Sequence, residues 1–435
     1  MRQEDLSMPL LEQHLLCKKK NNDTVILHIN HCMDNSFYFS SQLKRVFCDV
    51  VFVAVPYNNK DIRDDFDCVA YHAYSAEDGY HLYRDKLELE LVKGSFLDAT
   101  ARLTAIALES EILAYARQGK RIIFVEDGGY HYDIIADMVS RHPVLGKAII
   151  GAVEQTTSGT RKSCFRNSLT YPVVSVSRSK YKVRIESYFV ANRVIDGLTR
   201  LLHEMDAFLD FRRILMLGYG IIGRSVALCL KSRNMNIHVF DLDDDIQETA
   251  VNEGFSLWDG IYHDNMIVLG NSGERSFTME MLDHFLAGEA KRIVLASSSS
   301  KQTEFEAIFP FLKSCRSINS AHSTTYTFEN EKEIVLLADG YPLNFVDESQ
   351  DSLTFNMIDP VFTEIYLLIR FLKNHRGSLG GNTYLLGANR LVDDEIDENA
   401  LVKSWMEING LQLDLNTFNR HPNEAALVNH VLLQE

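Results

Sequence analysis

The chain has 435 residues, which at about 150 residues per domain predicts two or three domains. Apolar residues make up 46% and charged residues 24%, proportions typical of a folded globular protein and not of a disordered one. The 44 basic and 60 acidic residues give a net charge of −16, which argues against a nucleic-acid binder or a protein that docks on anionic membranes. The one run of three bases, Lys18-Lys19-Lys20, is expected to be a solvated element end.

The cysteines and the N-terminus indicate a soluble, cytoplasmic protein. Seven cysteines are scattered along the chain without any C-x-x-C pair, so we expect reduced thiols in the core rather than disulfides or a zinc site. The histidines show no metal-site spacing either. No apolar run approaches the roughly 20 residues of a membrane span, and the N-terminus carries acids where a signal peptide needs bases.

Short apolar runs alternate with longer amphipathic segments along the chain. Strands are predicted, in chain order, at residues 24–29, 48–55, 121–125, 147–153, 212–217, 236–240, 266–269, 291–296 and 333–338. Helices are predicted at residues 97–117, 221–233, 279–286 and 361–372. This alternation predicts an α/β fold with mostly parallel sheets.

One longer helix is predicted between the first and second groups of strands. Apolar residues recur there at helical spacing and form a continuous stripe. The stripe consists of Ala191, Val194, Ile195, Leu198, Leu201, Leu202 and Met205. Because a new strand follows at residue 212, this helix is interpreted as the connection into a second domain.

The most informative local pattern is a glycine-rich turn after the strand at residues 212–217. Gly218, Gly220 and Gly223 form G-x-G-x-x-G, in which the first glycine permits a tight turn, the second admits a pyrophosphate and the third lets helix and strand pack closely. The next strand ends at Asp241, 241 − 218 = 23 residues after Gly218, near the spacing of a carboxylate that binds the adenosine ribose of NAD. A purely structural turn without a nucleotide is the alternative.

Around that turn, the chain resembles the adenosylhomocysteinase (S-adenosylhomocysteine hydrolase) family. Five stretches occur in the family's order and near its spacing, over roughly residues 25–410. They are residues 126–129 (EDGG), 154–159 (EQTTSG), 171–176 (YPVVSV) running on to Lys182 and Asp196-Gly197, 212–241 with the glycine turn, and 333–340 (EIVLLADG) with Asn344.

The resemblance implies a fold and a division of the chain. We expect a Rossmann-type NAD-binding domain at 187–343, inserted into a second α/β domain that binds substrate. The two parts of the substrate domain are expected at 1–186 and 344–400, followed by a C-terminal segment at 401–435. The resemblance also implies a homo-oligomer, a dimer or tetramer, and a role in one-carbon metabolism.

The chemistry of the family gives these residues their expected roles. In that chemistry, bound NAD⁺ oxidises the 3′-hydroxyl of a nucleoside sugar, a base removes the acidified 4′-hydrogen, the 5′ thiol leaves, water adds and the ketone is reduced again. The catalytic candidates carried over are Lys182 at the 3′-hydroxyl, Asp127 and His31 for proton transfer, and Glu186 in place of an aspartate. The cofactor-binding candidates are Gly218, Gly220, Ile221, Ile222, Gly223, Asp241, Thr156, Thr157, Ser158, Ser187 and Asn344.

Other positions depart from the family pattern, mainly where it recognises adenine and homocysteine. The substrate-binding candidates Gln155 and Asn35 each stand where the family has a glutamate, and Met33 replaces a threonine. Ser187 replaces an asparagine beside the cofactor. A serine run at 297–300 stands where a histidine is expected, acidic residues at 347–351 replace a His-Pro pair, and the family's Lys/Tyr-bearing tail is expected to be missing.

Three functions remain open from the sequence. The first is an NAD-dependent enzyme, a hydrolase, lyase or oxidoreductase, that acts on an altered substrate such as a different nucleoside, sugar or thioether. The second is S-adenosylhomocysteine hydrolysis itself in a remodelled pocket. The third is a non-catalytic NAD-binding protein or regulatory subunit. No nucleic-acid, membrane or metal partner is expected.

Overall fold

A computed structural model describes residues 7–16, 18–55, 69–75, 78–165, 169–233, 235–299, 302–346 and 352–412. The chain divides into two compact units. The discontinuous unit is formed by the chain up to Val183 and again from Thr354, and the inserted unit is Arg184–Leu353. These unit boundaries fall at 183/184 and 353/354. The domain boundaries expected from the sequence are at 186/187 and 343/344.

The discontinuous unit contains a nine-stranded sheet in the order β17-β8-β7-β6-β1-β2-β3-β4-β5. The strands from β17 to β3 are parallel, whereas β4 and β5 extend the sheet as an antiparallel edge that the sequence does not predict. The bounds are β1 Thr24–His31, β2 Asp49–Val55, β3 Val69–Ser75, β4 Gly79–Arg84, β5 Leu87–Val92, β6 Arg121–Glu126, β7 Ile149–Glu154, β8 Val173–Ser175 and β17 Thr383–Leu385.

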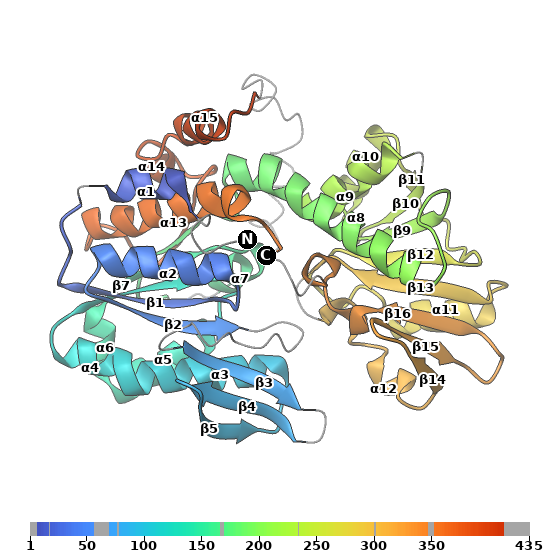
Figure 1. The fold of residues 1–435 in the computed structure, drawn as a ribbon, viewed down its shortest axis with the longest axis horizontal. Helices are drawn as coiled ribbons and strands as arrows, with labels where there is room; N and C mark the ends of the chain where they lie inside the picture. The colour runs from blue at the N-terminus through green and yellow to red at the C-terminus, as the bar shows by residue number, and fades with distance from the viewer. Residues whose placement is uncertain are drawn as a thin grey trace. The chain divides into compact units, whose positions relative to one another are not determined.

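Helices cover both faces of this sheet (Figure 1). On one face lie α1 Pro9–Leu15, α2 Asp34–Val46 and α13 Phe355–Asn374, and on the other lie α3 Phe96–Ala107, α4 Leu113–Arg117, α5 Tyr132–Arg141 and α6 Pro143–Ala148. A π-helical turn, η2 Leu108–Ile112, joins α3 to α4 within the helix predicted at 97–117. The unit is completed by α7 Thr157–Cys164, α14 Arg390–Asp393 and α15 Glu398–Ile408.

The beginning and end of the discontinuous unit are joined through α13. The buried carboxylate of Asp359 accepts hydrogen bonds from the backbone N–H groups of Leu10 (2.8 Å) and Leu11 (2.9 Å) in the first turn of α1. The rings of Phe39 in α2 and Phe362 in α13 stack at 4.4 Å. One face of the sheet therefore depends on a helix that comes after the whole inserted unit in the chain.

The inserted unit contains an eight-stranded sheet in the order β11-β10-β9-β12-β13-β16-β15-β14. Its first six strands are parallel and follow the order 3-2-1-4-5-6 of dinucleotide-binding sheets, while β15 and β14 add an antiparallel edge. The bounds are β9 Arg213–Leu217, β10 Asn236–Phe240, β11 Ser256–Leu257, β12 Met266–Gly270, β13 Arg292–Ser297, β14 Arg316–Asn319, β15 Ser323–Thr327 and β16 Glu333–Leu337.

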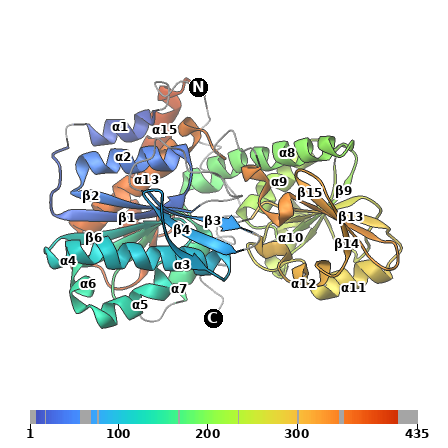
Figure 2. The ribbon, with the colours of Figure 1, turned by 60° about the horizontal axis from the view of Figure 1, so that its bottom comes forward.

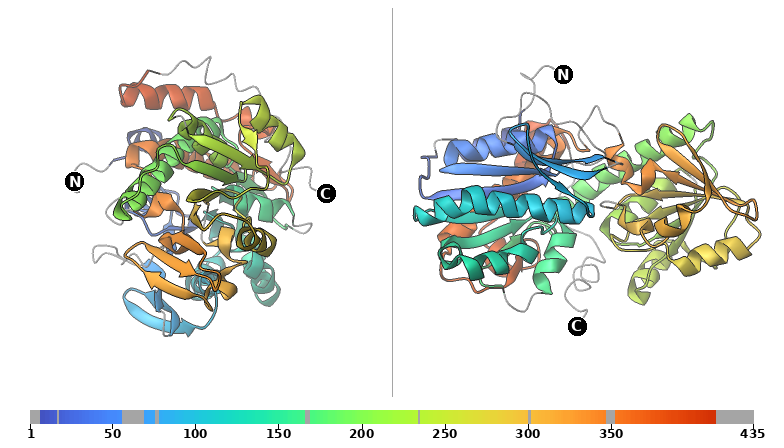
Figure 3. Two further views of the ribbon diagram at one scale, coloured as in Figure 1. Left: turned by 90° about the vertical axis from the view of Figure 1, so that its right-hand side faces the viewer. Right: turned by 90° about the horizontal axis from the view of Figure 1, so that it is seen from below.

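Helices also cover both faces of the second sheet (Figures 2 and 3). The long predicted helix is confirmed as α8 Ser187–Glu204, which packs with α9 Ile221–Lys231 and α10 Asp244–Asn252 against one face. On the other face lie α11 Met279–Ala287 and α12 Phe309–Leu312. Short turns complete this unit: η3 Lys182–Glu186 before α8, η4 Thr303–Phe305, η5 Ala338–Gly340 and η6 Leu343–Phe345. The predicted α/β class with Rossmann-type order is confirmed, with two antiparallel edges as the difference.

Other predicted features have mixed outcomes. Five cysteines lie in the described ranges, and all are free thiols, but they are half-buried and not the core residues expected. Cys17 and Cys68 lie outside the described residues. Within the described ranges, no helix is long and apolar enough to cross a membrane, and no group of three or more His, Cys, Asp or Glu residues is arranged to hold a metal ion.

Candidate active site

The strand order of the discontinuous unit reverses between β1 and β6. From β1 the chain continues to β2 and β3 on one side, and from β6 it continues to β7 and β8 on the other. Open α/β sheets bind ligands outside the carboxyl ends of their strands at such a reversal. His31 is the last residue of β1, Asp127 follows β6 and Gln155 follows β7, so three of the predicted site residues lie at this edge.

His31 and Asp127 meet at the reversal point. The Nε2 atom of His31 lies 3.4 Å from Oδ1 of Asp127, and the two side chains are 15% and 9% exposed. An imidazole and a carboxylate that are partly buried at this distance are suited to hold and transfer a proton. The structure thus brings together two catalytic candidates that are distant in sequence.

A buried network of amides links the same pair to the two substrate-binding candidates. Asn30 donates from Nδ2 to Oε1 of Gln155 (3.1 Å), and its Oδ1 accepts the N–H of His31 (2.7 Å). The hydroxyl of Ser36 lies 3.3 Å from Oδ1 of Asn30 and 3.3 Å from Oδ1 of Asn35. Asn30 was not predicted as a site residue, although a buried asparagine in an otherwise apolar strand is a signal for one.

A pair of buried glutamates lies next to this network. Glu126 and Glu154 are partners in the register of β6 and β7 and are 1% and 0% exposed. Oε1 of Glu154 accepts the N–H of Gly128 (3.1 Å) and both the N–H (2.8 Å) and the hydroxyl (2.7 Å) of Thr156. Burial, reinforced by the neighbouring charge of Glu126, raises the pKa of Glu154 to about 8.

Glu126 is held from its other side by a histidine that the sequence did not single out. Oε1 of Glu126 lies 2.5 Å from Nδ1 of His131 and accepts the N–H of the same residue (2.9 Å). The Nε2 atom of His131 is 2.7 Å from the hydroxyl of Tyr171. This chain of buried polar groups fixes the loop 127–131, which carries Asp127.

The raised pKa of Glu154 predicts a specific pH dependence of stability. Between about pH 4.5, the ordinary value, and about pH 8, the folded protein holds one proton more than the unfolded chain, so the free energy of unfolding falls as pH rises through this window. Glu154→Gln keeps the oxygen that accepts three hydrogen bonds and cannot ionise. We expect its urea midpoint, measured relative to the unsubstituted protein, to be higher at pH 8 than at pH 5.

The matched control for this measurement is Glu289→Gln on an exposed position of the inserted unit. Its midpoint should run parallel to that of the unsubstituted protein at both pH values. A Glu154→Gln curve that also runs parallel would show that Glu154 ionises normally in the folded state.

The first threonine of the predicted cofactor triplet, Thr156, makes its hydrogen bonds within the fold. Thr156 caps α7 by accepting the N–H of Gly159 (3.0 Å), and its hydroxyl also donates to Glu154. A Cβ atom added to Gly159 would fall 2.1 Å from Cδ of Glu154, so the glycine makes room for the buried acid. Thr157 is half-buried and Ser158 is exposed.

Arg178 is a buried cation that the sequence analysis did not single out. It follows β8 and is 6% exposed, and burial, together with the charge of Arg161, lowers its pKa to about 10. Its Nε has no hydrogen-bond partner, and its guanidinium forms no ion pair with any described carboxylate. A buried cation without a counter-charge is unfavourable, so this position favours a ligand with an anionic group.

The remaining catalytic candidates lie on the π-helical turn η3. Lys182 begins this turn and is half-buried, and Glu186 ends it and is buried. The boundary between the two units falls inside the turn, between Val183 and Arg184. Ser187 follows at the start of α8 and accepts a hydrogen bond from the hydroxyl of Ser225 in α9 (3.0 Å).

The glycine-rich turn of the inserted unit has the geometry of a dinucleotide site. It lies where the strand order reverses between β9 and β12. Gly218 has a φ of +93°, and a Cβ atom on Gly223 would fall 2.3 Å from the carbonyl oxygen of Gly218. At Gly220, by contrast, an added Cβ would meet nothing within 4 Å. Gly220 is the N-cap of α9 and offers no side-chain cap, so the first turn of α9 presents N–H groups to a phosphate.

Two polar side chains complete this site. Asp241 accepts the N–H of Tyr219 at Oδ2 (2.7 Å) and the N–H of Asp243 at Oδ1 (3.1 Å), which holds its carboxylate beside the glycine turn. Asn344 donates from Nδ2 to Ser352 (2.8 Å), and its Oδ1 is buried without a partner. An open glycine, an uncapped helix start, a carboxylate beside the turn and a buried amide oxygen without a partner fit NAD.

The serines that replace the family's histidine are held by a buried acid. Glu304 accepts hydrogen bonds from the hydroxyls of Ser299 (2.5 Å) and Ser272 (3.0 Å) and from the N–H of Gly273 (2.7 Å). Ser298 donates to Asn271. These contacts fix the loops after β12 and β13. The acidic residues 347–351 and the chain beyond residue 412 lie outside the described residues.

Comparisons with known proteins agree with these motifs. No family model matches the chain. An S-inosyl-L-homocysteine hydrolase of Methanopyrus kandleri is 30% identical over 137 residues, 31% of each chain. An adenosylhomocysteinase of Sulfurisphaera tokodaii is 25% identical over 325 residues, which cover 72% of this chain and 71% of that protein. The chain is therefore similar to adenosylhomocysteinases over most of its length, as a divergent relative.

Other relatives of this adenosylhomocysteinase-like chain carry less information about activity. An uncharacterized protein of Mycobacterium tuberculosis is 25% identical over 350 residues, 78% of this chain, but the match spans only 62% of that protein's length. Among solved structures, a phosphoglycerate oxidoreductase from Vibrio cholerae covers 80% of this chain and 99% of its own at 10% identity and a TM-score of 0.39. The oligomeric state and the cytoplasmic location stay predictions.

Proposed function

We propose that this chain is an NAD-dependent enzyme that transiently oxidises a sugar hydroxyl of a nucleoside or nucleoside thioether whose base differs from adenine or is bound differently. The observation that carries the proposal is the His31–Asp127 pair, 3.4 Å apart at the strand reversal of the discontinuous unit. A non-catalytic cofactor-binding protein has no need of an acid–base pair at this position.

The inserted unit would hold the cofactor. Gly218, Gly220 and the first turn of α9 would bind the pyrophosphate, Asp241 the adenosine ribose, and Asn344 the nicotinamide amide through its unsatisfied oxygen. The first turn of α9 contains Ile221, Ile222 and Gly223, and Ser187 in α8 contacts α9 through the hydroxyl of Ser225. When bound, NAD⁺ supplies a hydride acceptor for the sugar.

The discontinuous unit would handle the protons. His31 and Asp127 would remove and return the hydrogen on C4′, with His31 holding the proton while Asp127 stabilises the imidazolium. Lys182 would act at the 3′-hydroxyl, and Glu186 would supply the carboxylate that the family has as an aspartate. Arg178 would bind an anionic group of the substrate, because no described carboxylate forms an ion pair with its guanidinium.

The substrate is proposed to differ because amides replace carboxylates. Gln155 and Asn35 stand where the family has glutamates, and both belong to the Asn30–Ser36 network. An amide both donates and accepts, whereas an ionised glutamate only accepts, so the site suits a different donor–acceptor pattern on the sugar or the base. The relatives' names cover adenosyl and inosyl compounds, which differ in this pattern at the base.

The test is the absorbance of NAD⁺-loaded full-length protein at 340 nm after addition of adenosine, inosine, S-adenosylhomocysteine or S-inosylhomocysteine. We expect a stoichiometric rise with at least one of these compounds, because reduced nicotinamide absorbs there. Protein that releases NAD⁺ on denaturation but shows no rise with any nucleoside or sugar would contradict catalysis and would favour the cofactor-binding alternative.

A further inference from the structure

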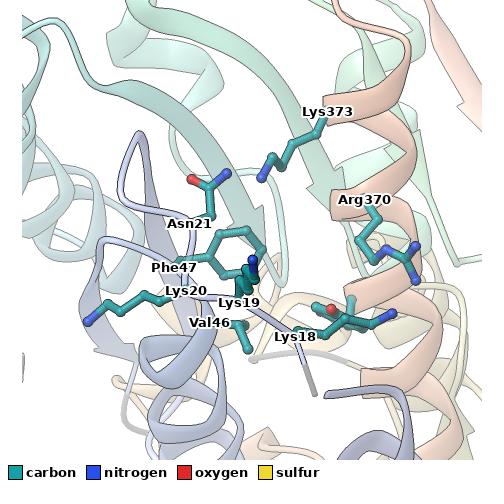
Figure 4. Close-up of a pocket in the computed structure, with 9 residues that line it drawn as sticks. Lys18, Lys19, Lys20, Asn21, Val46, Phe47, Arg370 and Lys373 are labelled. Atoms are coloured by element: carbon teal, nitrogen blue, oxygen red, sulfur yellow. The ribbon is translucent and has the colours of Figure 1, made fainter. Parts of the chain in front are cut away.

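A cavity of about 360 Å³ lies at the end of the discontinuous unit opposite the candidate active site. Figure 4 shows residues that line this cavity. Its walls are the segment after α1, the end of α2 and the second half of α13. These segments precede β1 and β2, whereas His31 is the last residue of β1. The eight residues of β1 separate the two places by about 25 Å. The proposed NAD and substrate chemistry makes no use of this cavity.

Five cations line the cavity, Lys18, Lys19, Lys20, Arg370 and Lys373. Within the described ranges, none of the five has a carboxylate within 4 Å, although the chain has 60 acidic and 44 basic residues. On an acidic protein, lysines in a run ordinarily pair with carboxylates or extend into solvent away from other cations. Here they converge with two cations from a helix that is more than 340 residues later in the chain.

The cations influence one another. Burial lowers the pKa of Lys373, and the nearby charge of Arg370 lowers it further, while Asp23 acts in the opposite direction. The pKa of His14 is also lowered, by burial and by the charges of Arg370 and Lys18. Asp23 thus offsets part of the positive charge near Lys373, and the five cations still leave an excess of positive charge that an anion would relieve.

The floor of the cavity is apolar and aromatic. Val46, Phe47 and Tyr366 are buried, and the rings of Phe47 and Tyr366 lie 6.5 Å apart in an edge-to-face arrangement. The Nζ atom of Lys373 lies 5.5 Å from the centre of the Phe47 ring. Figure 4 shows Lys373 and Asn21 pointing toward each other across the opening. Oδ1 of Asn21 already accepts the N–H of Thr24 (2.9 Å), which leaves its amide nitrogen to donate.

We propose that this cavity is a second ligand site, which binds a small organic polyanion with two or more phosphate groups on an aromatic or apolar body, of the nucleoside di- or triphosphate class. The cations would bind the phosphates, and Phe47 with Tyr366 would contact the body. The volume suits a small molecule, and the net charge of −16 opposes docking of a nucleic acid or an anionic membrane.

The test is calorimetric titration of the NAD⁺-saturated full-length protein with ATP, ADP, pyrophosphate and inorganic phosphate. We expect affinity to fall in that order and to weaken as salt increases. Lys18→Ala/Lys19→Ala, at exposed positions outside the core, should weaken ATP binding about tenfold or more, because each charge-assisted contact contributes enough for such a factor. Arg370→Gln should weaken it similarly.

The matched control is Lys291→Ala/Lys313→Ala, which removes two exposed charges from the inserted unit. It should bind ATP as the unsubstituted protein does. Equal ATP affinity in both double variants would overturn the proposal, since binding would then be elsewhere. Loss of ATP binding in the control as well, or tighter binding of anionic vesicles or of duplex DNA than of ATP, would also overturn it. Failure of the nucleoside test at 340 nm leaves these outcomes unchanged.

Discussion

Asp127→Asn is expected to uncouple the two halves of the proposed reaction. Oxidation of the sugar does not need the carboxylate, so addition of the active nucleoside should still produce the rise at 340 nm. Removal of the C4′ hydrogen needs it, and exchange of that hydrogen for deuterium, followed by NMR, should slow by about 10² to 10⁴-fold. The reason is the contact between Asp127 and Nε2 of His31, because a neutral amide cannot stabilise the imidazolium that forms when His31 holds the proton.

The control for this experiment is Asp137→Asn, the same change on an exposed carboxylate of α5 that pairs with Arg141. It should leave both the absorbance change and the exchange rate unaltered. Normal exchange in Asp127→Asn would remove Asp127 from the proton transfer. Loss of the absorbance change as well would assign Asp127 to substrate binding instead.

Two glycine-to-alanine variants of the glycine-rich turn are expected to lose NAD⁺ affinity for different reasons. Gly220 has a φ of −69° and open space around a new Cβ atom, so Gly220→Ala should fold normally and be unchanged or more stable by up to about 1 kcal/mol. The methyl group would instead occupy the place of the pyrophosphate and weaken NAD⁺ binding about tenfold or more. Calorimetric titration with NAD⁺ and urea unfolding measure the two effects separately.

Gly223→Ala provides the contrast. Its Cβ atom would collide with the carbonyl oxygen of Gly218 at 2.3 Å, a backbone atom, so the turn itself must move and we expect a loss of about 1 to 3 kcal/mol in stability. NAD⁺ affinity falls in this variant too, but together with stability. Full NAD⁺ affinity in Gly220→Ala would show that no phosphate passes over this glycine.

The parts of the fold that local pattern determines were predictable from sequence. The strand before Gly218, the helix after it and the strand β10, which ends at Phe240 just before Asp241, follow from glycine chemistry and spacing. The stripe of α8 is equally local. The edge strands β5 and β14 were missed because short strands with exposed side chains lack the dense apolar runs of buried ones. The partly buried strands β4 and β15 were missed because they are short and rich in polar and aromatic residues.

The candidate site was predictable only in part, because it depends on strand order. His31 and Asp127 each end or follow a predicted strand, but their contact requires β6 to lie beside β1 rather than beside β5, which precedes it in the chain. The pairing of Glu126 with Glu154 depends on register in the same way. The burial of Arg178 had no local signal, since its neighbours in sequence are polar and basic.

The attachment of α13 to the first sheet determines the order in which the protein can be completed during synthesis. The inserted unit is continuous in sequence and has all its strands once Leu353 has left the ribosome. The sheet that carries His31 and Asp127 is made earlier, but Asp359 and Phe362, which hold α1 and α2 in place, are made later. Nascent chains therefore carry a sheet with one face incompletely covered while a finished domain forms downstream, an interval in which chaperones would be needed most.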